Sequence, residues 1–214
     1  MATIKFIADH HAGGIANDTF AKSQHLTWQH INNAHRDRWN FVSSLGLYGG
    51  YNFYIQSDGT FKQFRAIGEE TAAQIGYNFN CISFCLAGNF IEKNGIRIEQ
   101  PTKEQLATRK QLINEIINKD FRRIAVAPNT TIEVSISSIH PHNFYQTTQC
   151  NCYPDSWGRE LMKDTTQPMN VRYSAILSLV DSIIVLIQKL RAELSALFQE
   201  KPLGGVDRGC TGMS

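Results

Sequence analysis

The sequence lacks several features that would restrict its function class. Residues 1–14 contain no basic segment followed by a long apolar run, so they do not resemble a secretory signal. The formal net charge is only +2, which is too small to indicate a nucleic-acid-binding protein. Hydrophobic residues make up 42% and charged residues 19% of the chain, which is ordinary for a globular protein.

Cysteine is scarce and irregularly spaced. The chain has 5 cysteines, an odd number that does not form a regular disulfide framework. Cys150 and Cys152 would close a small, strained ring, and a reducing cytosol disfavours disulfides. Metal binding and apolar packing are therefore the two main interpretations of this Cys-x-Cys pair.

No apolar run is long enough to span a membrane, because the most apolar stretch, 175–187, contains Asp181 and falls short of about 20 residues. Apolar residues in this region instead recur at spacings of three and four, which predicts an amphipathic, coiled-coil-like helix over 170–198. We expect this helix to self-associate into a homo-oligomer or to pack on its own domain. Its seam comprises Tyr173, Ile176, Val180, Ile183, Ile187, Leu190, Leu194 and Leu197.

The order of the remaining elements predicts an α/β fold. Alternating residues on both sides of Asp58 and Gly59 predict a β-hairpin. Thr102 and Gln105 have the spacing of a helix capping box. Strands that alternate with helices indicate an α/β core. Further strands are expected over 3–11, 80–90 and 130–140, and helices over 27–39 and 101–119.

Alternation also predicts which side chains share a face of the sheet. Tyr51 is expected on the same face as Phe53 and Ile55, so one interpretation of Tyr51 is a core aromatic. Cys85 is expected on the face opposite to Phe84.

Histidines gather where two predicted strands end. His10 and His11 end the first strand, and His140 and His142 follow the last. Functional groups in α/β folds collect on loops at such positions. Imidazole and thiolate groups bind zinc, and a catalytic zinc commonly has three protein ligands. These histidines and a cysteine form a candidate zinc site; solvated histidines and buried cysteines are the alternative.

Six segments, read in order, carry a family resemblance. They are IADHHAGG, HRDRWN, GGYNFYIQSDGTFKQFR, GYNFNCISFCLAGNF, TKEQLATRKQLI and HNFYQTTQC. Together they span roughly residues 3–163 and resemble the zinc-dependent N-acetylmuramoyl-L-alanine amidases of the phage-lysozyme and peptidoglycan-recognition type. The resemblance implies an α/β fold with a central mixed β-sheet flanked by helices. It also implies hydrolysis of the amide between muramic acid's lactyl group and L-alanine in bacterial peptidoglycan.

The resemblance implies a ligand set for Zn²⁺. His10 and His142 match the family's histidine ligands, and Cys150 matches the third ligand at the family's spacing of eight. The family usually has Pro-Gly after this cysteine, whereas this chain has Asn151 and then Cys152. Cys152 therefore stays an alternative to Cys150.

The resemblance also implies catalytic groups. Tyr51 matches a tyrosine beside the zinc, where a phenol can donate a hydrogen bond to a developing oxyanion. Thr148 matches a position where the peptidoglycan-recognition branch often has threonine, whose hydroxyl can donate a second hydrogen bond. Cys85 stands where another branch of the family has a catalytic glutamate, so the general base is not identified. Asn52 stands at a position where histidine is common in the family.

These observations predict an endolysin-type amidase. Its zinc amidase domain is expected over 1–166, the amphipathic helix over 170–198, and a flexible tail over 199–214. A non-catalytic peptidoglycan-binding module and a structural virion or assembly protein are the alternatives. Without a signal peptide, the protein is expected to stay in the host cytoplasm until it is released to the cell wall, or to be carried in a virion.

Overall fold

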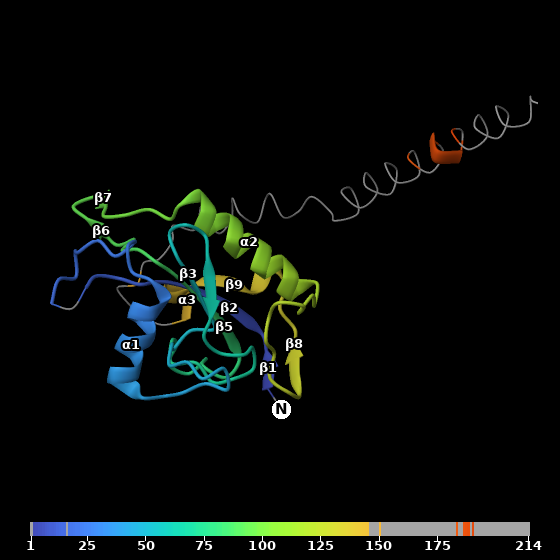
Figure 1. Cartoon of the computed structure of the whole chain (residues 1–214). Coiled ribbons are helices and arrows are strands. Elements are labelled where there is room, and N and C mark those ends of the chain that lie inside the picture. The colour runs from blue at the N-terminus through green and yellow to red at the C-terminus, as the bar shows by residue number, and fades with distance from the viewer. Residues whose placement is uncertain are drawn as a thin grey trace, which may run out of the picture. The chain divides into compact units, whose positions relative to one another are not determined.

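In the computed structural model, the chain divides into two units, residues 1–164 and 165–214. The structure describes residues 2–15, 17–145, 150, 183, 186–188 and 190. The fold set out below is that of the first unit (Figure 1). The predicted division near residue 166 lies outside the described residues and stays a prediction.

A five-stranded mixed sheet with the order β4-β3-β5-β2-β9 forms the centre of the first unit. Strands β3, β5, β2 and β9 run parallel to one another, whereas the edge strand β4 is antiparallel to β3. The predicted central mixed sheet is therefore confirmed. The strands are β2 (Phe6–His11), β3 (Phe53–Ile55), β4 (Phe61–Gln63), β5 (Cys81–Leu86) and β9 (Ile139–Pro141).

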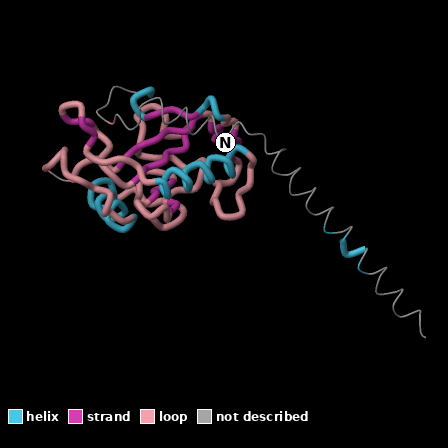
Figure 2. The backbone as a smooth tube through the Cα atoms, turned by 90° about the horizontal axis from the view of Figure 1, so that it is seen from above, coloured by secondary structure: helices cyan, strands magenta, loops and turns pink. Residues whose placement is uncertain are grey.

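Two small sheets accompany the central one, and Figure 2 shows the strands close together with loops around them. Strand β1 (Ala2–Ile4) pairs with β8 (Thr130–Ile132) in a parallel arrangement. Strand β6 (Glu92–Lys93) pairs with β7 (Ile96–Arg97) in an antiparallel hairpin.

Two helices cover opposite faces of the central sheet, as Figure 1 shows. Helix α2 (Lys103–Ile117) packs against the face that carries Ile82, Phe84 and Leu86. Helix α1 (Trp28–Trp39) packs through Ile31 against the face that carries Tyr54 and Cys85. The predicted alternation in β5 is therefore confirmed. A short 3-10 helix, η1 (Ile136–Ser138), and the single-turn α3 (His142–Tyr145) flank β9.

Helix α2 begins with the predicted capping box. The Thr102 hydroxyl accepts a hydrogen bond from the Gln105 backbone at 3.1 Å, and the Gln105 side chain accepts one from the Thr102 backbone at 3.0 Å. The Gln105 amide also donates to the backbone oxygens of Ile55 and Ala87, at 3.1 and 2.9 Å. The Gln105 side chain thus helps to start the helix. It also ties the helix to the ends of β3 and β5, because it satisfies buried backbone oxygens there.

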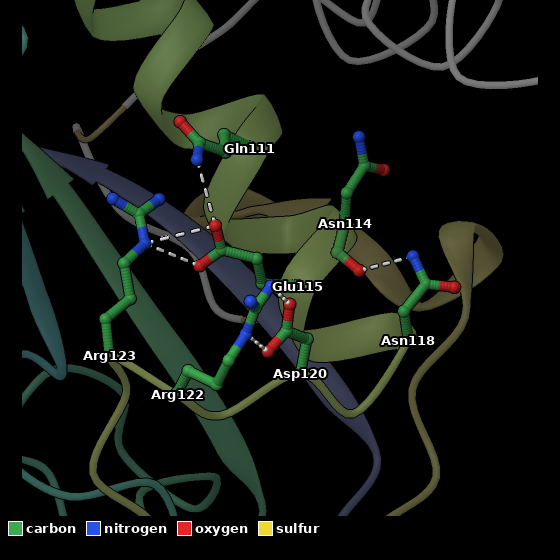
Figure 3. Close-up of polar contacts among 7 residues, drawn as sticks. All are labelled: Gln111, Asn114, Glu115, Asn118, Asp120, Arg122 and Arg123. Carbon is green, nitrogen blue, oxygen red and sulfur yellow. Dashed lines mark hydrogen bonds and ion pairs between the residues drawn. The ribbon is translucent and has the colours of Figure 1, made fainter. Parts of the chain in front are cut away.

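The other end of α2 is tied to the loop that follows it. Arg123 pairs with Glu115 at 2.8 Å, and Arg122 pairs with Asp120 at 2.6 Å (Figure 3). Both arginines are well exposed, so solvent screens these pairs and each contributes little to stability.

A buried ion pair joins α2 to β2. The Arg109 Nε atom donates to an Asp9 carboxylate oxygen at 2.7 Å, and the two side chains are only 4% and 5% exposed. Asp9 immediately precedes His10, so this contact fixes the strand at the candidate site. The buried charges are tolerated because the guanidinium and carboxylate pair in a two-point geometry.

Three predictions about strands need correction. The strand expected over 3–11 is divided at Lys5, because β1 pairs with β8 whereas β2 pairs with β5 and β9. The strand expected over 130–140 is interrupted by η1, where serine side chains bond to one another and to nearby backbone. Tyr51 precedes β3, so strand alternation does not reach it; it packs with Tyr54 instead of Phe53.

The predicted helix over 170–198 lies almost entirely outside the described residues. Within it, Ile183, Leu186, Ile187 and Leu190 are described as helical and exposed. Self-association of this helix stays a prediction.

Candidate metal centre and active site

Three side chains that can bind a metal converge in the first unit. One possible ligand atom from each of His10, His142 and Cys150 lies within 4.8 Å of the other two. His10 and His142 are buried, and Cys150 is half-buried. The structure therefore brings together the three residues chosen from the sequence as metal ligands.

Parallel strand pairing places the two histidines. Strand β9 runs beside β2 with Pro141 opposite Asp9, so the next residues along the two strands are His142 and His10. Their ring centroids lie 4.2 Å apart. Because both strands run in the same direction, residues 132 positions apart in the chain reach the same end of the sheet.

The surroundings of the histidines favour neutral imidazole. Burial lowers the pKa of His10 well below its usual value, and neighbouring His142 and His11 lower it further. Burial also lowers the pKa of His142. Among the described residues, none forms a hydrogen bond with the buried Nε2 atom of His10. A buried nitrogen without such a partner is costly unless it has another ligand, and neutral imidazole is the form that binds metal.

His11 does not face this group. Its Nδ1 atom accepts a hydrogen bond from the Phe90 backbone at 3.0 Å, and its ring stacks on Phe90. The pKa of His11 is lowered to about 4, mainly by burial, so this side chain is a neutral core residue at ordinary pH. Neighbouring residues of a strand point to opposite faces, which explains the difference between His10 and His11.

Tyr51 lies beside the histidines. Its ring centroid is 5.2 Å from that of His10 and 5.5 Å from that of His35. Tyr51 also packs against the buried cluster that contains Tyr54 and Cys85. Burial, the main cause, and Cys85 raise the pKa of Tyr51 well above its usual value, so the phenol is a neutral donor.

His35 is a neighbour of the site that the sequence placed only within the helix expected over 27–39. Its Nδ1 atom accepts a hydrogen bond from the Gly50 backbone at 2.8 Å, directly before Tyr51. The His35 ring also packs against Trp39 in a tilted arrangement, with ring centroids 4.5 Å apart. Its place in that helix was the only sequence signal for this contact.

Asn52 has a structural role in this chain. Its side chain donates to the backbone oxygen of Ala66 at 3.1 Å and accepts from the Ser83 backbone at 2.9 Å. Since the amide is buried and bonded on both sides, it ties the start of β3 to β5.

Cys150 departs from the sequence-based expectation in one respect. Its sulfur is in a disulfide, whereas Cys81 and Cys85 are free. A sulfur cannot be in a disulfide and bind a metal as a thiolate at the same time. Its state depends on the redox potential of the compartment, which residue spacing does not determine.

Two other residues considered from the sequence lie outside the described residues: Thr148, the proposed second donor, and Cys152, the alternative ligand. His140 is described, but it is not part of the three-residue group. Its ring stacks on Phe144 at 3.9 Å with an interplanar angle of 8°.

Comparison with solved structures defines the class of fold. An endolysin N-acetylmuramoyl-L-alanine amidase, LysCS from Clostridium intestinale URNW, matches with a TM-score of 0.50 and 20% identity, covering 75% of this chain and 95% of that one. LysC from the same organism matches with a TM-score of 0.50 and 21% identity, over 76% and 98%. The Ph2119 endolysin from Thermus scotoductus MAT2119 bacteriophage Ph2119 has a TM-score of 0.50 and 13% identity, over 75% and 86%. The chain has the fold of these amidases.

A family model gives the narrower assignment. The model of the N-acetylmuramoyl-L-alanine amidase family, Amidase_2, matches residues 1–154. This chain belongs to that family. No curated protein matches the sequence. Within the described part of the chain, none of the helices has the length and apolar character needed to cross a membrane.

Proposed function

We propose that the protein is a zinc-dependent N-acetylmuramoyl-L-alanine amidase of the endolysin type. Its substrate would be the amide that joins the lactyl group of muramic acid to L-alanine in bacterial peptidoglycan. The convergence of His10, His142 and Cys150 within 4.8 Å carries this proposal, together with family membership.

The residues present fit a zinc ion. Zinc bonds to imidazole nitrogen and thiolate sulfur are about 2.0–2.3 Å long, so two ligands of one ion lie roughly 3.5 Å apart. The observed separations, within 4.8 Å, require only small side-chain adjustments once the Cys150 sulfur is reduced. Bound there, zinc would supply Lewis-acid chemistry, which polarises a carbonyl and makes water more acidic.

Tyr51 would act on the oxygen of the scissile amide. Its ring lies beside that of the candidate ligand His10, and its raised pKa keeps the proton on the phenol. A neutral donor placed where negative charge develops stabilises the transition state more than the ground state. Thr148 is proposed as a second donor from a segment outside the described residues.

Digestion of purified peptidoglycan tests the proposed function. We expect the reduced, zinc-loaded chain to release peptides that begin with L-alanine and to leave intact lactyl groups on the glycan, as measured by mass spectrometry. A chelator should stop the reaction and added zinc should restore it. New reducing sugar ends would instead indicate a glycosidase and contradict the proposal.

Cys150→Ser should weaken zinc binding far more than Cys152→Ser. The reverse order would make Cys152 the ligand.

Tyr51→Phe is expected to lower kcat by roughly 10²-fold, which is the effect of removing one oxyanion donor. The zinc content and the melting temperature should stay close to those of the parent chain, because the ring remains in place. The measurements are steady-state kinetics, metal analysis and thermal unfolding. Normal turnover in this variant would show that Tyr51 only packs in the site and has no catalytic role.

A peptidoglycan-binding module without turnover is the second candidate. The disulfide at Cys150 favours it, because an oxidised sulfur does not complete the ligand set. Binding of the polymer under both oxidising and reducing conditions, without cleavage in either, would support this candidate. Cleavage that appears only after reduction would support the amidase.

The location proposed for this activity is the bacterial cell wall, reached from the host cytoplasm or from a virion. Self-association through the helix over 170–198 would raise avidity for a repetitive polymer.

A further inference from the structure

The sulfur of Cys150 has two roles that exclude one another. Ligand atoms of Cys150, His10 and His142 lie within 4.8 Å of one another, and the Cys150 sulfur is also in a disulfide. A metal thiolate requires a reduced, deprotonated sulfur, whereas a disulfide sulfur is bonded to a second sulfur and carries no charge. The state of this one atom therefore decides whether the ligand set is complete.

Cys150 also differs from the two free cysteines of β5 in its access to solvent. It is half-buried and packs against the core cluster that contains Ile7 and Phe84. Cys81 and Cys85 are free, and they are only 2% and 0% exposed. Thiol–disulfide exchange requires that the attacking thiol reach a sulfur atom. A small reductant can therefore act at Cys150, whereas burial shields the thiols of β5.

The two histidines are arranged for a third ligand while Cys150 is still oxidised. Their ring centroids lie 4.2 Å apart, and His10 is only 2% exposed. None of the residues that the structure describes forms a hydrogen bond with the His10 Nε2 atom. A buried nitrogen in this state is unfavourable, and a bound metal ion would satisfy it. Since the ion also needs the Cys150 thiolate, metal binding favours the reduced chain.

We propose that the Cys150 disulfide is a redox switch that controls assembly of the candidate metal centre. A dithiol reductant attacks the disulfide, the bond between the Cys150 sulfur and its partner sulfur breaks, and the reductant leaves as a disulfide. Two electrons and two protons pass to the chain, which gains two thiols. The Cys150 thiol releases its proton when metal binds, and it completes the set with His10 and His142. The switch rests on the proposed function, because it regulates the centre of the proposed amidase.

The switch gives the chain different states in different compartments. In a reducing cytosol the thiol form prevails, so the ligand set can be completed. In an oxidising medium the disulfide form prevails, and the two histidines lack their third ligand. Protein released from a cell would therefore lose activity as the surrounding medium oxidises it.

The midpoint potential of the full chain, measured at several zinc concentrations, tests the switch. The chain is equilibrated in mixtures of reduced and oxidised dithiothreitol with free zinc held by a metal buffer, and its thiols are counted by alkylation and mass spectrometry. Above the dissociation constant, each tenfold rise in free zinc should raise the midpoint by about 30 mV, because zinc binds only the reduced form. A midpoint that does not change with zinc would overturn the proposal.

Variants distinguish the sulfur that binds metal from the sulfur that blocks it. Cys150→Ser should lose zinc in both redox states. Mass spectrometry of disulfide-linked peptides identifies the cysteine that pairs with Cys150, and its replacement by serine should allow zinc to bind without any reductant. Cys81→Ala is the control, because this free thiol lies opposite Phe6 rather than His10, and the redox dependence should stay unchanged.

Two further results separate failure of the switch from failure of the proposed function. Cobalt in place of zinc should give a thiolate-to-metal absorption band in the reduced chain and none in the oxidised chain. Equal metal binding by the two forms, or cleavage of peptidoglycan by the oxidised form, would overturn the switch and leave the amidase standing. A redox-dependent metal site in a chain that never cleaves peptidoglycan would support the switch and contradict the proposed function.

Discussion

His10→Ala should abolish turnover, whereas His11→Ala should leave most of it. His10 is one of three converging candidate ligands, and its buried Nε2 atom has no hydrogen-bond partner among the described residues. Loss of a metal that stabilises the transition state by several kcal/mol corresponds to a decrease of about 10³-fold or more in kcat. Steady-state kinetics on peptidoglycan and metal analysis of the purified variants provide the comparison.

His11→Ala is a demanding control because it removes a buried imidazole from the same strand. It deletes the acceptor for the Phe90 backbone and a stacking contact, so the melting temperature should fall. Assays are therefore run well below the melting temperature of both variants. Equal loss of zinc from the two variants at that temperature would contradict the assignment of His10 as the ligand of this pair.

Arg109→Met should destabilise the first unit by about 3–5 kcal/mol, because it leaves the buried Asp9 carboxylate without its partner. Unfolding by urea, followed by circular dichroism, gives the change in free energy. The double variant Asp9→Leu with Arg109→Met should recover much of the loss, since it removes both charges together. If the double variant is less stable than Arg109→Met, the ion pair adds to the free energy of unfolding beyond the neutralisation of a buried charge.

Arg123→Met provides the exposed counterpart. It breaks the pair with Glu115 near the other end of the same helix, where the Arg123 side chain is 41% exposed (Figure 3). The expected loss is below about 1 kcal/mol because solvent screens the charges. Similar losses for Arg109→Met and Arg123→Met would show that burial does not determine the contribution of these pairs.

Features encoded by neighbouring residues could be predicted well. The capping box at Thr102, the hairpin around Gly59 and the alternation of β5 all follow from residues a few positions apart. Gly59 adopts a φ of +83°, which glycine reaches without the steric cost that other residues carry. The strand predicted over 130–140 was less accurate, because serine side chains compete for backbone groups in η1.

The candidate site was predictable in composition but not in full geometry. Residue types and the resemblance led to His10, His142 and Cys150, which the structure brings together. Alternation assigned Tyr51 to the face of Phe53, whereas the strand begins only at Phe53 and Tyr51 packs against the cluster that contains Tyr54 and Cys85. Where a strand begins depends on its pairing partners, which alternation within one segment does not reveal.

The sequence by itself therefore determined the local elements and the kinds of group that the site contains. Tertiary structure decided which of His10 and His11 faces the other candidate ligands, and which buried cluster Tyr51 packs against. It also formed the Asp9–Arg109 pair, whose members are 100 residues apart. The physical reason is the range of the interactions: caps and turns depend on hydrogen bonds between near neighbours, whereas these contacts arise only when strand register and helix packing bring distant segments together.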